Sequence, residues 1–102
     1  MFILGIMGER RISELPSETI EALSSVLEKG PTIDWKKLMT KGFASLYSPQ
    51  DVDDFRKENS PAKALLDDLI GREVKLQDLV GALRVIGNER AISIIHKGSY
   101  YF

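Results

Sequence analysis

Hydrophobic side chains recur at steps of three and four residues along most of the chain, with polar residues at the positions between them. This spacing places the hydrophobic residues on one face of a helix. The clearest stripe consists of Leu76, Leu79, Val80, Leu83 and Ile86. Five further stripes consist of Ile20, Leu23, Val26 and Leu27; Trp35, Leu38 and Met39; Val52 and Phe55; Leu65, Leu66, Leu69 and Ile70; and Ala91, Ile92, Ile94 and Ile95. The pattern therefore predicts six short helices. It favours a place in the core for Trp35, and the alternative is that Trp35 is an interface anchor.

Prolines and glycines separate these stripes. Ser48-Pro49 and Ser60-Pro61 are each typical of a helix start, because the serine hydroxyl accepts from a free backbone N–H and proline has no N–H to lose. Pro16 indicates a third helix start. Gly30-Pro31 and Gly87-Asn88 indicate breaks between helices, since glycine readily takes the left-handed conformation at a helix end.

The chain length of 102 residues fits one domain. No run alternates hydrophobic and polar residues long enough to form a convincing strand. Six short helices joined by short loops predict an all-α, six-helix antiparallel bundle. We assign the bundle to residues 13–97, an N-terminal extension to residues 1–12 and a C-terminal tail to residues 98–102. The stretch from Gly42 to Pro49 carries no clear pattern and is predicted to be a longer loop.

The composition is that of a folded protein without a strong overall charge. Hydrophobic residues make up 43% of the chain, and 14 basic side chains nearly cancel 15 acidic ones, which leaves a net charge of −1. This balance argues against disorder, and it removes the broad basic field on which nucleic-acid binding relies. The sequence contains no cysteine, which excludes disulfides, thiolate metal sites and cysteine nucleophiles.

The first eight residues, Met1 to Gly8, are largely apolar. Eight residues are too few to span a bilayer, and Glu9, Arg10 and Arg11 follow where a signal peptide would need a cleavage site. We therefore predict neither a signal peptide nor a membrane anchor. The segment is expected to lie over the core, and the alternative is that it forms an adhesive contact strip.

An ordered set of short motifs runs along residues 13–97. The motifs are Leu15-Pro16; Asp34-Trp35-Lys36-Lys37-Leu38; Ser60-Pro61 with Leu65-Leu66; Lys75-Leu76-Gln77-Asp78-Leu79-Val80; and Ile86-Gly87-Asn88-Glu89-Arg90-Ala91. In this order the motifs resemble those of the death domain, including the domains of interleukin-1-receptor-associated kinases and Pelle, the myeloid differentiation adaptor, the lymphoid paracaspase, and the neurotrophin and netrin receptors. The chain departs from the family at Leu69, where most members carry a second tryptophan, and at Val74 or Lys75, where a threonine often caps the fifth helix.

The resemblance implies a Greek-key bundle of six helices and a cytoplasmic, non-catalytic module. Such a module binds other death domains, or copies of itself, and assembles oligomeric receptor, adaptor, kinase or paracaspase complexes in innate immune, NF-κB-type or apoptotic signalling. Any catalysis would belong to a kinase or protease region attached in the full-length protein. No cofactor, metal, nucleic acid or membrane insertion is expected.

Catalytic and metal-binding patterns are weak in this sequence. His96 is the only histidine, and no nucleophile-elbow glycine pattern surrounds any serine. The pairs Asp53-Asp54 and Asp67-Asp68 are adjacent residues on helices, so their carboxylates point about 100° apart and do not converge as acid and base. Asp51, Asp53 and Asp54 lack the spacing, glycine and final glutamate of a calcium loop. A small hydrolase built on His96 is retained only as a rival hypothesis.

The charged residues are unevenly distributed. Lys36, Lys37 and Lys41 lie on the second predicted helix, whereas the acidic residues Asp51, Asp53, Asp54 and Asp67 lie on the third and fourth. One basic and one acidic face would suit a head-to-tail contact between copies of the domain, which can build rings or helical filaments. Death-domain assemblies typically use charged helix faces, so these seven residues are our predicted protein-binding residues. One alternative is that these are ordinary solubilising charges that face solvent. The other is a small helical nucleic-acid-binding domain that uses the three lysines on phosphates.

Overall fold

The computed structural model describes residues 10–28 and 34–99. This part of the chain contains six helical stretches and no strand. In order, they are the helix α2 (Ser17–Glu28), α3 (Asp34–Lys37) continued by the π-helical turn η2 (Leu38–Gly42), α4 (Pro49–Arg56), α5 (Pro61–Gly71), α6 (Leu76–Val85) and α7 (Glu89–Ser99), and a short 3₁₀ turn η1 (Ile12–Glu14) precedes them. The predicted all-α, six-helix fold is confirmed.

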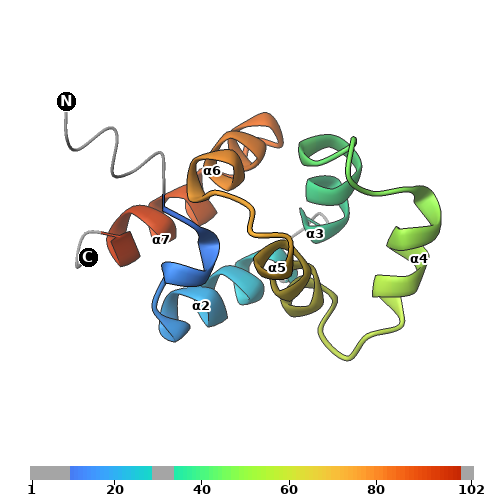
Figure 1. Ribbon diagram of the computed structural model, residues 1–102, viewed down its shortest axis with the longest axis horizontal. Coiled ribbons are helices and arrows are strands. Elements are labelled where there is room, and N and C mark those ends of the chain that lie inside the picture. Colours follow the sequence, from blue (N-terminus) through green and yellow to red (C-terminus); the bar gives the residue numbers. More distant parts are fainter. Residues whose placement is uncertain (1–9, 29–33, 100–102) are drawn as a thin grey trace.

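The helices pack around one hydrophobic core. Helix α2 lies against α5 and α7, while α6 lies against α7 and η2. Helix α4 stands at the edge of the bundle, where it contacts α5 and η2 (Figure 1). The large side chains that are completely buried are Ile12, Leu23, Leu27, Leu38, Met39, Leu65, Leu66, Leu69, Leu76, Leu79, Leu83 and Ile95. Most of them belong to the hydrophobic stripes of the sequence, as a helical period requires.

The second helix changes its winding partway along. Residues 34–37 are α-helical, but the Phe43 N–H donates to the Leu38 carbonyl at 2.8 Å, five residues back, so the helix widens into a π turn. Gly42 ends this turn and lies directly against Ala82 of α6. Because glycine has no Cβ, the backbone of η2 can approach α6 closely at this point.

Residues 43–48 connect η2 to α4, where a longer loop is predicted. It begins with a turn, in which the Leu46 N–H donates to the Phe43 carbonyl at 2.9 Å. Phe43 and Tyr47 are both buried in the core. Trp35 is also buried, with 6% of its surface exposed, which confirms its predicted place in the core. Residues 43–48 thus form the predicted loop between η2 and α4, and two buried aromatic side chains fix it in place.

The predicted helix starts are confirmed at both serine-proline pairs. Ser48 Oγ accepts from the Asp51 N–H at 3.3 Å, and Ser60 Oγ accepts from the Lys63 N–H at 3.4 Å. Asn88, which the sequence pattern indicates only as part of a break, caps α7. Its Oδ1 accepts from the Ala91 N–H at 3.0 Å, while its Nδ2 donates to Asp34 at 2.6 Å. This buried asparagine ties the start of α7 to the start of α3.

The chain enters the bundle beside the start of α6. The Ile12 N–H donates to the Val74 carbonyl at 3.2 Å, and the Leu76 N–H donates to the Arg10 carbonyl at 2.8 Å. These bonds hold residues 10–12 in place. The predictions for Met1 to Gly8, for the Gly30-Pro31 break and for most of the C-terminal tail fall outside the described residues.

Two helices end in the same hydrogen-bonded motif but with different residues. At the end of α5 the Val74 N–H donates to the Leu69 carbonyl at 3.1 Å, and Glu73 has a φ of 58°. At the end of α6 the Asn88 N–H donates to the Leu83 carbonyl at 3.0 Å, and Gly87 has a φ of 75°. Both ends are Schellman motifs, which require a left-handed residue. Glycine satisfies this requirement without strain, whereas glutamate does not.

We expect Glu73→Gly to raise the free energy of unfolding by about 0.5–1 kcal/mol, because it removes left-handed strain at the cost of some chain entropy. The converse change, Gly87→Ala, is expected to lower it by about 1–2 kcal/mol. Urea unfolding followed by circular dichroism measures both. The exposed Arg11–Glu73 ion pair, at 3.8 Å, adds little. A destabilised Glu73→Gly variant would contradict this account of the α5 terminus.

Candidate protein-interaction surface

The three predicted basic residues lie on α3 and η2. Lys36 and Lys37 are half-buried at the end of α3, and Lys41 is exposed on the π turn. Within the described part of the chain, none of their ammonium groups forms a hydrogen bond or an ion pair. Their positive charges are therefore not neutralised by the fold, and they remain available to an anionic partner.

The acidic residues of α4 are largely engaged in local contacts. The Asp51 carboxylate accepts from the Ser48 N–H at 2.8 Å and so completes the capping box of α4. Asp54 accepts from the Gln50 side chain at 3.1 Å, and Asp53 lies 3.9 Å from Arg56. Asp51 thus has a clear role in the helix start, whereas the contacts of Asp53 and Asp54 are exposed and weak.

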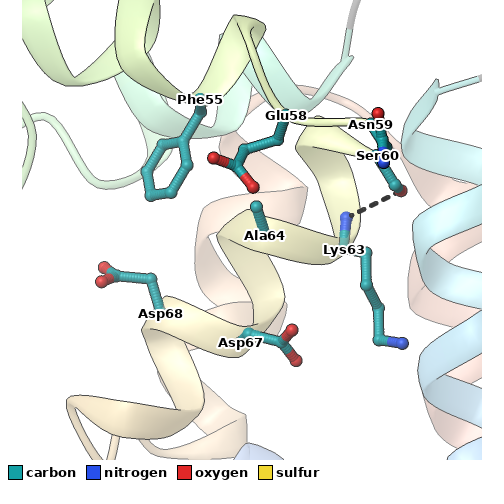
Figure 2. Close-up of a pocket in the computed structure, with 8 residues that line it drawn as sticks. All are labelled: Phe55, Glu58, Asn59, Ser60, Lys63, Ala64, Asp67 and Asp68. Atoms are coloured by element: carbon teal, nitrogen blue, oxygen red, sulfur yellow. Dashed lines mark hydrogen bonds between the residues drawn. The ribbon is translucent and has the colours of Figure 1, made fainter.

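Asp67 differs from the acidic residues of α4. It is exposed on α5, and within the described residues its carboxylate forms no hydrogen bond and no ion pair. Together with Glu58, which is likewise exposed, it lines an open groove of about 570 Å³ between the end of α4 and α5. Figure 2 shows Glu58 directed from above toward Ala64, with the Phe55 ring on one side. The groove combines carboxylates and one lysine, Lys63, with an apolar floor.

The fold brings the elements that carry both charge sets into contact. η2 packs against α4, and α3 packs against α5. Even so, no ion pair in the described part of the chain joins one of the three lysines to one of the four aspartates. The two sets of charges therefore do not neutralise one another within a single copy of the domain.

The buried Tyr47 forms a polar cluster with Asp68 and Arg72 of the α5 region. The Tyr47 hydroxyl donates to Asp68 Oδ2 at 2.5 Å, and Arg72 Nε donates to the same oxygen at 2.7 Å. The Arg72 guanidinium also lies over the Tyr47 ring, 5.2 Å from its centre, and the Phe55 ring meets the Tyr47 ring edge-on at 5.9 Å. This cluster is not evident from the sequence. Its only signal was the four-residue spacing of Asp68 and Arg72 on one helix.

The pKa values of this cluster follow from its contacts. Burial raises the pKa of Tyr47, and the hydrogen bond to the Asp68 carboxylate raises it further. Burial alone would raise the pKa of Asp68, but hydrogen bonds from Tyr47 and Arg72 outweigh this effect and lower it. Asp68 is therefore a firmly ionised carboxylate whose charge is already satisfied inside the domain.

His96 lies away from both charge sets. It is exposed near the end of α7 and lines a hollow of about 450 Å³ with residues of α6. The residues on the α6 side are Gln77, Asp78, Val80, Gly81 and Arg84. None of these is a serine, threonine or cysteine, so the described lining offers His96 no hydroxyl or thiol nucleophile. Within the described part of the chain, no group of three or more histidine, cysteine, aspartate or glutamate residues could hold a metal ion.

No helix in the described part of the chain is both long and apolar enough to cross a membrane. A family model described as the death domain matches residues 20–99, from the first turn of α2 to the end of α7. No curated protein and no solved structure is significantly similar to the chain.

Proposed function

Because the chain belongs to the death-domain family, we propose that it joins other death domains, or copies of itself, into oligomeric signalling complexes. Domains of this family are homotypic protein-interaction modules without catalytic activity. The proposed complexes are receptor, adaptor, kinase or paracaspase assemblies of innate immune, NF-κB-type or apoptotic signalling inside the cell. The bundle of residues 13–97 would carry this function, and any enzymatic activity would belong to other regions of a longer protein.

The proposal assigns the contact to two charged surfaces. The basic surface consists of Lys36, Lys37 and Lys41, and the acidic surface consists of Asp51, Asp53, Asp54 and Asp67. The observation that carries the assignment is that the lysine ammonium groups have no acidic partner within the described residues. Among the acidic residues, Asp67 has the strongest claim because its carboxylate is also unpaired there. Asp51 has the weakest, since it completes a capping box.

A double charge reversal at Lys36→Glu and Lys37→Glu is expected to abolish salt-sensitive assembly of the domain. Like charges would then face each other across the contact, at a cost of several kcal/mol. Size-exclusion chromatography with light scattering, at low and high salt, measures the assembly of the chain alone and with a candidate death-domain partner. Screening by salt should weaken the wild-type assembly as well.

The matched control is the double variant Lys75→Glu and Lys97→Glu. It changes the net charge by the same amount, but at two exposed lysines outside the proposed surface. It should assemble like the wild type. If both double variants assemble like the wild type, the basic surface is wrongly assigned. If the wild type stays monomeric in every mixture but binds any DNA duplex in a salt-dependent way, the nucleic-acid alternative is favoured.

A further inference from the structure

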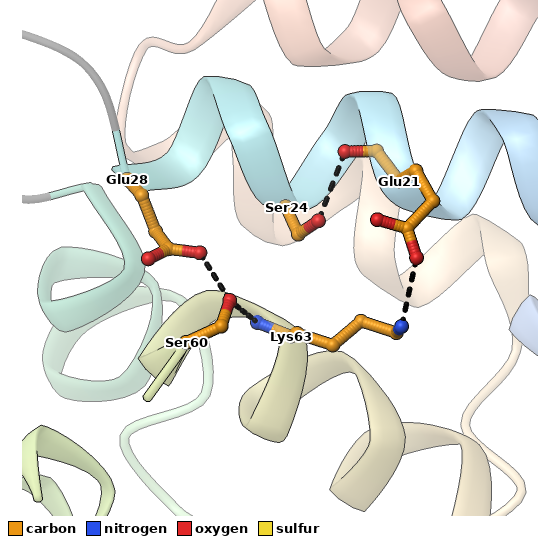
Figure 3. A network of polar contacts seen from close by, with 5 residues as sticks. All are labelled: Glu21, Ser24, Glu28, Ser60 and Lys63. Carbon is orange, nitrogen blue, oxygen red and sulfur yellow. Dashed lines mark hydrogen bonds and ion pairs between the residues drawn. The ribbon is translucent and has the colours of Figure 1, made fainter. Parts of the chain in front are cut away.

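Ser60 connects two helices through a single hydroxyl group. Its Oγ donates to the carboxylate of Glu28, the last residue of α2, and accepts from the Lys63 N–H in the first turn of α5. The Lys63 ammonium in turn pairs with Glu21 of α2 at 2.9 Å. Figure 3 shows this network bridging α2 and α5. Ser60 is therefore both the cap of α5 and a polar link between the two helices.

The sequence around Ser60 is a substrate pattern for one class of enzyme. Ser60 is followed directly by Pro61, and Lys63 stands three positions after the serine. A protein kinase with an apolar pocket for the next residue selects proline, which has no N–H to leave unpaired there. An acidic subsite of the kinase would attract the lysine. We propose that Ser60 is a phosphorylation site for a proline-directed serine/threonine kinase.

The position of Ser60 suits such a reaction. The preceding residues 57–59 form an exposed turn, and the hydroxyl itself lies in an exposed contact between the two helices. Opening the first turn of α5 presents the serine, the proline and the lysine to the kinase. Ser60 Oγ then attacks the γ-phosphorus of ATP, its proton passes to the catalytic base of the kinase, and ADP leaves.

The phosphate would change the contact between α2 and α5. It removes the proton that Ser60 donates to Glu28 and places a charge of about −1.5 to −2 against that carboxylate. The positive helix start and the Lys63 ammonium favour the phosphate, but Lys63 must leave Glu21 to reach it. Both polar links from α5 to α2 are thereby lost or redirected. Phosphorylation consequently loosens the packing of α2 on α5.

The chain contains an internal control for the recognition step. Ser48-Pro49 is the other serine-proline pair of the sequence, and Ser48 is more exposed than Ser60. Three positions after Ser48, however, stands Asp51, whose carboxylate already contacts the serine. A kinase that favours a cation at this position should reject Ser48, so the two sites separate specificity from simple exposure.

The test treats the purified chain with a cyclin-dependent kinase, its cyclin and ATP, and reads intact mass and the modified residue by mass spectrometry. One phosphate on Ser60 is expected. Ser48→Ala should leave incorporation unchanged, and Ser60→Ala should abolish it. Pro61→Ala should also nearly abolish it while keeping the Ser60 hydroxyl and its bond to Glu28, so loss of the helix cap does not explain the result.

The consequence is measured by thermal unfolding of the phosphorylated chain. We expect its Tm to fall by about 4 °C or more, and to fall less when Glu28→Gln removes the opposing charge. Phosphate on Ser48 instead, no phosphate on a folded chain, or equal incorporation in the Pro61→Ala variant would overturn the site. An unchanged or raised Tm after modification of Ser60 would overturn the loosening of α2.

Discussion

The Trp35→Ala variant is expected to lose about 3–5 kcal/mol of unfolding free energy, the range found when large aromatic residues are removed from a core. Trp35 exposes only 6% of its surface and packs in the same cluster as Leu38 and Met39. Truncation would leave a cavity that the surrounding helices fill only in part. Because native domains are stable by only about 5–15 kcal/mol, this loss is a large fraction of the total stability.

Urea unfolding followed by circular dichroism measures this loss. Val85→Ala is the matched control, because Val85 is a large hydrophobic residue with 68% of its surface exposed, and its truncation should change stability by less than about 0.5 kcal/mol. If Trp35→Ala kept wild-type stability and lost only its assembly with partners, Trp35 would be an interface anchor and its place in the core would have to be abandoned.

The Gly42→Ala variant is expected to lose about 1–3 kcal/mol through overpacking. A Cβ at this position would lie 2.9 Å from the Ala82 Cβ and 2.9 Å from Leu38 Cδ1. Leu38 can rotate, but the Ala82 Cβ is fixed to the backbone of α6, so η2 and α6 must move apart.

Gly81→Ala provides the comparison for Gly42→Ala. Gly81 lies within α6, and an added Cβ would meet no atom within 4 Å. Alanine should therefore raise stability by about 0.5–1 kcal/mol there through its better helix propensity. Chemical denaturation of the two variants side by side measures the difference. Equal changes in stability at both positions would mean that the close approach of η2 to α6 does not contribute to the stability of the fold.

Local rules of the chain were sufficient to predict most of the fold. The hydrophobic stripes, for example Leu76, Leu79 and Leu83, report which face of a helix is buried, whatever it packs against. The caps at Ser48 and Ser60 are equally local, because each serine bonds a backbone N–H three residues later. The order of these motifs then indicated the family, which the match to residues 20–99 confirms.

Features that depend on distant residues could not be predicted. The π turn forms where Gly42 meets Ala82, forty positions further along the chain. Tyr47 is buried by contacts that include Asp68, and Asn88 caps α7 while bonding Asp34. The residues next to them in the sequence do not indicate which distant residues they contact. Only the structure could therefore reveal them.

For the predicted charged residues too, the sequence indicates their positions but not their contacts. Sequence position placed Lys36, Lys37 and Lys41 on one helix, but it could not tell which carboxylates the fold already uses. The structure distinguishes Asp51, which is engaged at a helix cap, from Asp67, whose carboxylate forms no hydrogen bond or ion pair within the described residues. Their roles in binding remain predictions that the charge-reversal experiment addresses.

The position of α2 has a consequence for the way the domain is made on the ribosome. α2 is the first long helix to emerge. It packs against α3, which follows directly, but also against α5 and α7, which follow much later (Figure 1). Until α7 has left the exit tunnel, the part of α2 that packs against α7 stays uncovered. The core of the domain is therefore completed only when its last helix is available, so folding relies on contacts between segments that lie far apart in the sequence.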